Sequence, residues 1–250
     1  MSRRIKGVSF DLWFTLIWSD DDILDEYTNA RINALYNVIS KYNTKISVED
    51  VEKIYSYTAH FRMIINPRKL IKYILYAVGL DPSEEVIEEA FNAYDRATYK
   101  IKPYINNEAI YTLEKLHKDG FTVGIISNTS FSTNSIWRML ENIGISEYIN
   151  IVISSANEEV KKPFPEIFYR FLSKAGLKPY EVVHVGDKYM DDVIGAYNVG
   201  MHAVLYRGLW DKYRIYREFR DEKLLNVCPR ECYVINDLRD IFKIIEKLKA

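Results

Sequence analysis

The sequence IKGVSFD, residues 5–11, is a short apolar run of β-forming residues that ends in an acid. Runs of the same character recur at 121–127, 149–154, 182–187 and 202–206, with a fainter one at 232–235. Continuous apolar runs of this length are typical of strands buried on both faces. Amphipathic patterns over 106–119, 133–143, 165–175 and 237–249 predict helices between or after them. Strands that alternate with helices predict an α/β fold with a doubly wound parallel sheet.

The interval 18–104 has a different pattern. Its apolar spacing predicts helices almost throughout, over about 21–42, 47–61, 67–78 and 83–100, and no strand-like apolar run occurs in it. Pro67, Gly79 and Pro82 stand at the breaks, and Pro103 closes the interval. We therefore expect a smaller, all-helical second domain, inserted after the first strand and lying over the sheet edge.

The composition is that of a globular protein with an ordinary core. Of the 250 residues, 48% are hydrophobic and 28% charged, which disfavours disorder and fibrous repeats. The net charge of -1 provides no basic field, so we expect neither nucleic acid nor membrane as a partner. Asp11 interrupts the apolar run after the basic start, which is not typical of a signal peptide. We expect a cytoplasmic monomer or homodimer. The chain contains no glutamine, a trait that occurs among hyperthermophile proteins.

Two features near the C-terminus receive structural interpretations. Cys228 and Cys232 are too few for a disulfide framework; a local link is conceivable, but we expect free thiols in a reducing compartment. Residues 206–220 interleave aromatic residues with arginines, which can mark single-strand nucleic-acid binding. Because the chain is not basic overall, we interpret that stretch as an exposed segment or a self-association surface.

Polar residues stand where the predicted strands end. Asp11, Ser127 with Asn128, and Asp187 each follow or close a strand, and Lys162 lies in the loop after 149–154. In open α/β sheets ligands bind beyond the carboxyl ends of the strands, so these groups should converge. A carboxylate can attack phosphorus, paired carboxylates can hold Mg²⁺, and an ammonium can offset phosphoryl charge.

Motifs at these positions resemble the haloacid dehalogenase (HAD) superfamily. They are FDLWFTL (10–16), ISNT (126–129), KPFPEIF (162–168) and VGDKYMDDVIGA (185–196), in the family's order along nearly the whole chain. The resemblance implies a Rossmann-like core of residues 1–17 and 103–250. It also implies that residues 18–102 form a helical cap domain of the C1 type.

The resemblance also implies roles in catalysis and substrate binding. Asp11 would be the nucleophile, Ser127 and Asn128 would contact the phosphate of a small phosphorylated substrate, and Lys162 would neutralise nucleophile and phosphate. Ser127 and Lys162 therefore count with Asp11 as candidate catalytic residues.

The implied cofactor is Mg²⁺. Asp11, Asp187 and the backbone carbonyl of Trp13 would be its protein ligands. Asp192 would contact it from the second shell or through water, and Asp191 is a weaker candidate. From the residues alone, Asp192 could instead simply cap the helix through Gly195.

The sequence departs from the family at its first motif. Family phosphatases carry a second Asp two residues after the nucleophile, which protonates the leaving group; here that residue is Trp13, whose indole cannot do so. We expect Trp13 to pack under the cap. The next position, often small in the family, is Phe14. An acid supplied by the cap could replace the missing group.

Three functions stay open at this point. The first is a Mg²⁺-dependent phosphatase acting through an aspartyl-phosphate, slow or specific for leaving groups that need no proton. The second is a carbon-attacking hydrolase: either a 2-haloacid dehalogenase, although Gly186-Asp187 argues against it, or a Schiff-base enzyme using Lys53, Lys69 or Lys72. The third is a phosphoryl-binding or regulatory protein without turnover. The histidines at 60, 117, 184 and 202 show no ligand spacing, so we expect core or surface roles for them.

Overall fold

The computed structural model describes residues 5–210 and 232–249, and its centre is a six-stranded parallel sheet. Cys228 and most of the 206–220 stretch lie outside these residues. The strand order is β5-β4-β1-β6-β7-β8, and every neighbouring pair is parallel. The strands are β1 (Gly7–Phe10), β4 (Thr122–Ser127), β5 (Ile151–Ser154), β6 (Val182–Gly186), β7 (His202–Tyr206) and β8 (Cys232–Ile235). Each lies within a predicted run.

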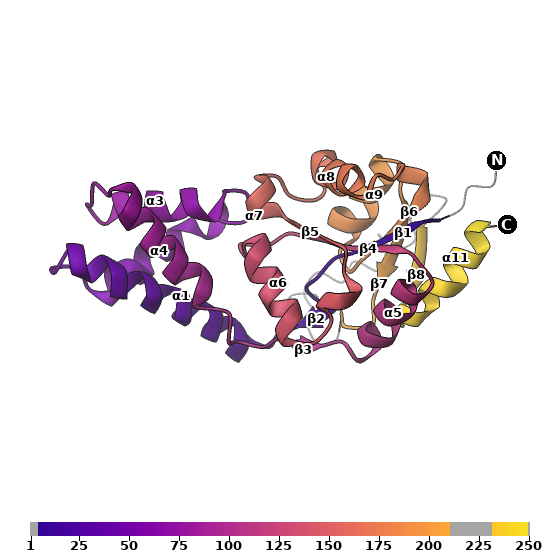
Figure 1. Ribbon diagram of the computed structural model, residues 1–250, viewed down its shortest axis with the longest axis horizontal. Helices are drawn as coiled ribbons and strands as arrows, with labels where there is room; N and C mark the ends of the chain where they lie inside the picture. The colour runs from indigo at the N-terminus through magenta and orange to yellow at the C-terminus, as the bar shows by residue number, and fades with distance from the viewer. Residues whose placement is uncertain (1–4, 211–231, 250) are drawn as a thin grey trace.

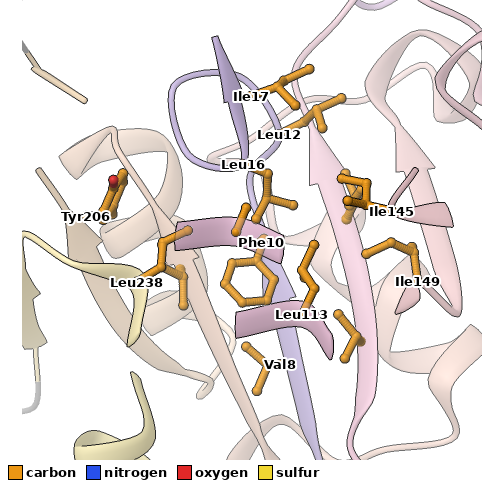
Figure 2. Close-up of a cluster of buried hydrophobic side chains, with 14 of the residues drawn as sticks. Val8, Phe10, Leu12, Leu16, Ile17, Leu113, Ile145, Ile149, Tyr206 and Leu238 are labelled. Carbon is orange, nitrogen blue, oxygen red and sulfur yellow. The ribbon is translucent and has the colours of Figure 1, made fainter. Parts of the chain in front are cut away.

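Helices cover both faces of this sheet, as Figure 1 shows. On one face α5 (Asn107–Lys118), α6 (Thr133–Asn142) and α11 (Ile241–Lys249) share a core with β1, whose Val8 and Phe10 are completely buried (Figure 2). On the other face α8 (Pro165–Ala175) and α9 (Gly195–Asn198) share a second core with β5 and β6. The α/β, doubly wound architecture predicted from the sequence is confirmed.

The inserted region folds around a third core of its own. It contains α1 (Asp21–Tyr42), α2 (Val48–Tyr57), a 3-10 turn (Thr58–His60), α3 (Pro67–Ala77) and α4 (Glu84–Arg96). The buried apolar residues of this third core all fall between Ile32 and Tyr94. Asp20 caps α1, Ser47 and Asp50 form a capping box on α2, and Pro67 begins α3. In Figure 1 these helices form a lobe beside the sheet, while the domain boundaries at 18 and 102 stay a prediction.

Several short elements were not predicted. β2 (Ile17–Trp18) and β3 (Tyr104–Ile105) pair antiparallel where the chain leaves and re-enters the sheet region. Two-residue strands carry no periodicity, so the sequence gives no signal for them. A π-helical segment (Tyr189–Ile194) precedes α9. The remaining short elements are α7 (Ser155–Glu158) and 3-10 turns at Ser146–Tyr148, Pro179–Glu181 and Leu238–Asp240.

The state of Cys232 and the lengths of the helices bear on two expectations from the sequence. Cys232 is disulfide-bonded, so the expectation of a free thiol at this position is wrong. The local pattern could not decide between a link and two thiols, because pairing depends on how the chain places the two Cβ atoms. Within the described residues, every helix is too short or too polar to cross a bilayer.

Candidate active site

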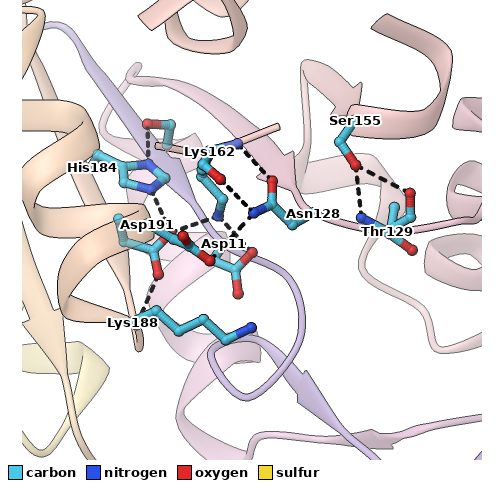
Figure 3. Close-up of polar contacts among 10 residues, drawn as sticks. Asp11, Asn128, Thr129, Ser155, Lys162, His184, Lys188 and Asp191 are labelled. Carbon is cyan, nitrogen blue, oxygen red and sulfur yellow. Dashed lines mark hydrogen bonds and ion pairs between the residues drawn. The ribbon is translucent and has the colours of Figure 1, made fainter. Parts of the chain in front are cut away.

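Asp11 and Lys162 form the centre of the site, beyond the carboxyl end of β1 (Figure 3). The Lys162 ammonium lies 2.7 Å from Asp11 Oδ1 and 2.5 Å from Asp192 Oδ1, and all three side chains are buried. Burial alone would lower the pKa of Lys162, but the two carboxylates outweigh it and raise that pKa above its usual value. The lysine is therefore a fixed positive charge against the candidate nucleophile.

Two further contacts hold Asp192 in place. Its Oδ2 accepts a hydrogen bond from the Lys188 backbone N–H at 2.9 Å, and its Oδ1 lies 3.2 Å from His184 Nε2. The other ring nitrogen of His184, Nδ1, lies 2.9 Å from Ser9 Oγ. Burial acts against the ionised form of Asp192, but Lys162 and His184 keep its pKa below the usual range. Asp192 is thus more than a helix cap.

His184 is the residue of this network that sequence reasoning missed. It is fully buried, as expected for a core histidine, but it has a carboxylate partner eight residues later in the chain. That spacing spans a strand end and a π-helical turn, so no periodic pattern reveals it. Burial lowers the pKa of His184, which favours the neutral ring.

Gly186 makes room for Asp192. A Cβ at position 186 would lie 2.2 Å from Asp192 Cγ and 2.4 Å from its Oδ2. The Asp192 carboxylate therefore occupies the space that any other side chain at 186 would fill. This gives a steric reason for glycine immediately before Asp187.

Three buried carboxylates converge next to the lysine. Ligand oxygens of Asp11, Asp187 and Asp192 all lie within 4.8 Å of one another. Asp187 follows β6 directly and is completely buried. Hard cations prefer oxygen ligands, and one or two carboxylates plus water are usual for Mg²⁺, so this donor set fits the ion. The Trp13 carbonyl as a further ligand stays a prediction.

Ser127 and Asn128 end β4 beside this cluster. The Ser127 hydroxyl is buried and has no hydrogen-bond partner among the described residues. The Asn128 side chain accepts from the Lys162 backbone N–H at 2.8 Å and donates to its carbonyl at 2.9 Å. It also donates to Asp191 Oδ2 at 3.3 Å. Asn128 thus fixes the segment that carries Lys162, and the expected phosphate contacts of both residues stay predictions.

A cavity of about 340 Å³ opens in front of these groups, between the sheet and the inserted helices. Asp11, Asn128 and Lys162 line it from the sheet side, with Asp191 and Lys188. From the inserted region the lining residues are Leu24, Tyr27, Thr28, Arg31, Tyr55, Arg62 and Met63. The inserted region therefore brings no carboxylate to the cavity wall, and the expectation of an acid from there finds no support. Lys53, Lys69 and Lys72 do not belong to the lining either.

Trp13 lies where the two sides meet. Its ring is 6.1 Å from that of Tyr27 on α1, edge to face, and 5.8 Å from that of Phe131. The expectation that Trp13 packs under the inserted helices is confirmed. Phe14, which follows it, has φ of 62°, a left-handed conformation that disfavours residues with a Cβ. Trp13 and Phe14, in the loop after Asp11, therefore line the cavity with aromatic side chains.

The comparisons with known proteins agree with this geometry. Residues 20–206 match the family described as haloacid dehalogenase-like hydrolase. The chain is 30% identical to glyceraldehyde 3-phosphate phosphatase of Pyrococcus furiosus over 250 residues, covering 98% of this chain and 95% of that protein. It is 35% identical to the protein of the same name from Methanothermobacter thermautotrophicus, covering 80% of this chain and 85% of that one.

Solved structures share the architecture. A 2-haloacid dehalogenase from Pseudomonas syringae superposes with a TM-score of 0.66 at 23% identity, covering 97% of this chain and 99% of that one. A HAD phosphatase from Thermococcus onnurineus superposes with a TM-score of 0.57 at 24% identity, covering 96% and 98%. At these identities the likeness shows the fold alone.

Proposed function

Because the chain belongs to the haloacid dehalogenase-like hydrolase family, we propose that it is a Mg²⁺-dependent phosphatase that acts on a small phosphorylated metabolite through an aspartyl-phosphate at Asp11. The membership confirms the family predicted from the four sequence motifs. The reaction, its site residues and its substrate are the proposal.

The convergence of Asp11, Asp187 and Asp192 carries the proposal. A carbon-attacking hydrolase needs one carboxylate nucleophile and no metal. Asp192 is already paired with Lys162, but a further buried carboxylate at Asp187 would destabilise such an enzyme without contributing to its chemistry. A phosphatase needs a cation there, because the transferring phosphoryl group is strongly anionic. Mg²⁺ at these carboxylates would stabilise that charge and orient the phosphoryl oxygens.

The chain's own residues provide the remaining chemistry. An Asp11 oxygen would attack phosphorus as the bond from phosphorus to the leaving oxygen breaks, and water would then hydrolyse the acyl phosphate. The Lys162 ammonium, 2.7 Å from Asp11, would orient the nucleophile and offset phosphoryl charge. The buried Ser127 hydroxyl, whose hydrogen-bonding capacity is unused among the described residues, would bind a phosphoryl oxygen.

Trp13 limits which leaving groups are suitable. General acid catalysis is typically worth ~10²–10⁴-fold, and an indole cannot provide it. We therefore expect fast turnover only for leaving groups that need little protonation, such as acyl phosphates and activated esters. The inserted region would act as the cap that closes over the substrate, with residues 18–102 as its extent and a monomer or homodimer as the assembly.

The names of the relatives suggest the first substrate to try. Proteins at about 30% identity are glyceraldehyde 3-phosphate phosphatases, and a cavity of about 340 Å³ is of the size expected for a small metabolite. Glyceraldehyde 3-phosphate is thus the first substrate to assay. Because its alkoxide leaving group needs a proton, the absence of an acid at position 13 predicts slow turnover for it.

Hydrolysis of an aryl phosphate with and without Mg²⁺ tests the reaction, because an aryl leaving group needs little protonation. We expect Mg²⁺-dependent turnover that Asp11→Asn abolishes. Asp119→Asn, which removes an exposed carboxylate paired with Lys115, is the matched control and should turn over like the wild type. Absence of turnover by the wild type would contradict the proposal. Metal-free hydrolysis of a 2-haloacid would then favour the dehalogenase alternative, and inactivity in both assays the binding-protein alternative.

Thermal unfolding tests the cation site without relying on turnover. Saturating Mg²⁺ at 100 times its Kd stabilises a folded protein by about 2.7 kcal/mol, or roughly 5–10 °C in Tm for a chain of this size. We expect such a shift in the wild type and in Asp119→Asn, and a much smaller one in Asp187→Ala. Equal shifts in all three proteins would exclude Asp187 as a ligand.

A further inference from the structure

Arg31 is a buried charged residue at the end of the cavity that the inserted helices line, which we call the cap end. It lies on α1 and is 3% exposed. Its Nη1 donates to Ser130 Oγ at 3.0 Å, but neither Nε nor Nη2 has a hydrogen-bond partner among the described residues. Buried polar groups are nearly always hydrogen-bonded, and an unsatisfied one in a native structure asks for an explanation.

The Arg31 guanidinium also lacks a carboxylate partner. Its central carbon lies 4.0 Å from the centre of the Phe131 ring and 4.6 Å from that of Tyr94. Ring faces attract a cation but accept no hydrogen bonds in the guanidinium plane. The nearby Asp95 carboxylate is occupied by Ser132 and Ser135, each at 2.6 Å, and no ion pair of Arg31 occurs within the described part of the chain. Burial alone would lower the pKa of Arg31, but Tyr94, Tyr55 and Asp95 favour its charged form and raise that pKa. The guanidinium nevertheless has no carboxylate in direct contact, and a buried cation without such a partner is costly.

A second guanidinium faces the same space. Arg62 also lines the cavity, with its central carbon 4.8 Å from the centre of the Tyr55 ring. Burial would raise the pKa of the Tyr55 hydroxyl, but Arg31 and Arg62 outweigh it and leave that pKa below its ordinary value. The cap end of the cavity therefore has a positive potential with no carboxylate among its lining residues.

We propose that Arg31, assisted by Arg62, binds a second anionic group of the substrate, so that the preferred substrates are phosphate esters or anhydrides that carry a carboxylate or a second phosphate at the far end. This deepens the proposed function and rests on it, because it takes the phosphoryl group to lie at Asp11. The guanidinium fork matches carboxylate and phosphate oxygens in a planar, two-bond contact. Such a group would satisfy the free Nε and Nη2 donors together.

A short stretch of chain joins the two ends of the cavity. Ser130, which accepts from Arg31, is two residues from Asn128, whose side chain is bonded to the Lys162 backbone. Two residues of chain span at most about 7 Å. Because both groups line the same cavity of about 340 Å³, we expect a substrate with a backbone of a few carbons to place one anion at Asp11 and Lys162 and the other at Arg31.

Calorimetric binding to the Asp11→Asn protein with Mg²⁺ tests this, because turnover is blocked. Three probes share a three-carbon chain and a phosphate: glyceraldehyde 3-phosphate with a neutral aldehyde end, 3-phosphoglycerate with a carboxylate, and propane-1,3-diol bisphosphate. We expect at least one anionic probe to bind about 10- to 100-fold more tightly than the aldehyde, as for charge-assisted hydrogen bonds. Whichever anionic probe binds more tightly identifies the group.

Substitutions in the same Asp11→Asn background assign the preference to the cap end. Arg31→Met should reduce the ratio between anionic and neutral probes to below about threefold, and Arg31→Lys, which keeps the charge without the fork, should leave an intermediate ratio. Arg138→Met, which removes an exposed arginine paired with Glu141, should leave the ratio unchanged. Arg62→Met, at a half-buried position, should reduce the ratio about threefold and serves if Arg31→Met fails to fold.

The outcomes separate the two proposals. Equal binding of the three probes, no binding by any probe, or a ratio that survives Arg31→Met in a folded protein overturns the anion site. Wild-type hydrolysis of an aryl phosphate, dependent on Asp11 and Mg²⁺, then shows whether the phosphatase proposal stands without it. A preference for an anionic probe that Arg31→Met removes supports the site even in a protein that turns over slowly.

Discussion

The two ends of the cavity satisfy their charges in opposite ways. At the sheet end Asp11, Lys162, Asp192 and His184 form one connected chain of contacts that ends at Ser9. At the cap end the Arg31 guanidinium contacts two aromatic rings and one hydroxyl, and two of its nitrogens are unsatisfied among the described residues. At the sheet end Asp11, Lys162 and Asp192 are paired within the protein, and it is the neighbouring Ser127 hydroxyl that is unsatisfied among the described residues. At the cap end it is the charged group itself whose hydrogen bonds are left for a ligand to complete.

This difference follows from what each end must do. Groups that stabilise a transition state work best when they are fixed before the substrate arrives, because no reorganisation is then needed at the moment of reaction. A group that selects a substrate gains most when its hydrogen bonds form only with the right ligand, since a wrong ligand leaves buried donors unpaired. The self-satisfied network suits chemistry, and the unsatisfied guanidinium suits selection.

Removal of the central cation should have the largest effect. Lys162→Met leaves the carboxylates of Asp11 and Asp192 buried without their shared ammonium, so we expect the free energy of unfolding to fall by about 3–5 kcal/mol in metal-free buffer. Lys69→Met is the matched control: Lys69 also pairs with a carboxylate, that of Glu159, but both side chains are exposed, and the loss should be below about 1 kcal/mol. Urea unfolding measures both. Similar losses in the two variants would mean that the sheet end is not held together by its charges.

Replacement of Trp13, where the two ends meet, should have the next largest effect. If the missing proton donor limits turnover, Trp13→Asp should raise the hydrolysis of an alkyl phosphate about 10²-fold, and that of an aryl phosphate much less. Trp13→Phe, which keeps the contacts with Tyr27 and Phe131 but adds no acid, is the control. Steady-state kinetics with Mg²⁺ gives the comparison. No gain in turnover by a folded, Mg²⁺-binding Trp13→Asp protein would show that the missing acid at position 13 does not limit the rate.

The sheet end could be predicted from the sequence, because its parts lie at the ends of strands. Asp11, Ser127 and Asp187 each follow or close an apolar run, and parallel strands bring such positions to one edge. Lys162 lies in the loop after a predicted strand, so its place in the chain also put it at this edge, and the family motif implied its role. The contact between His184 and Asp192 escaped, since it depends on a π-helical turn and on a glycine without a Cβ. Periodic patterns carry no information about either.

The cap end could not be predicted in the same way, although the sequence of α1 contains one indication of it. The buried positions of α1 include Tyr27, Arg31 and Leu35, which lie four residues apart on one helical face. An arginine inside an apolar stripe is an exception to binary patterning, and buried exceptions of this kind mark functional positions. The sequence alone does not show whether such a residue is paired, because its partners come from α4 and from the loop after β4.

Gly186→Ala should have the smallest effect. It tests whether the Asp192 carboxylate stays in place because position 186 has no side chain. The new Cβ would lie 2.2 Å from Asp192 Cγ, so the carboxylate must move away from Lys162. Overpacking typically costs about 1–3 kcal/mol of stability, and we expect turnover of an aryl phosphate to fall about tenfold with it. Gly124→Ala is the matched control, because its Cβ would lie 2.3 Å from Phe171, remote from the carboxylates. Both variants should lose similar stability in urea unfolding, whereas only Gly186→Ala should lose activity. Equal losses of activity in the two variants would mean that the position of the Asp192 carboxylate has no special effect on turnover. The contacts of Asp192 would then stabilise the fold without being required for the chemistry.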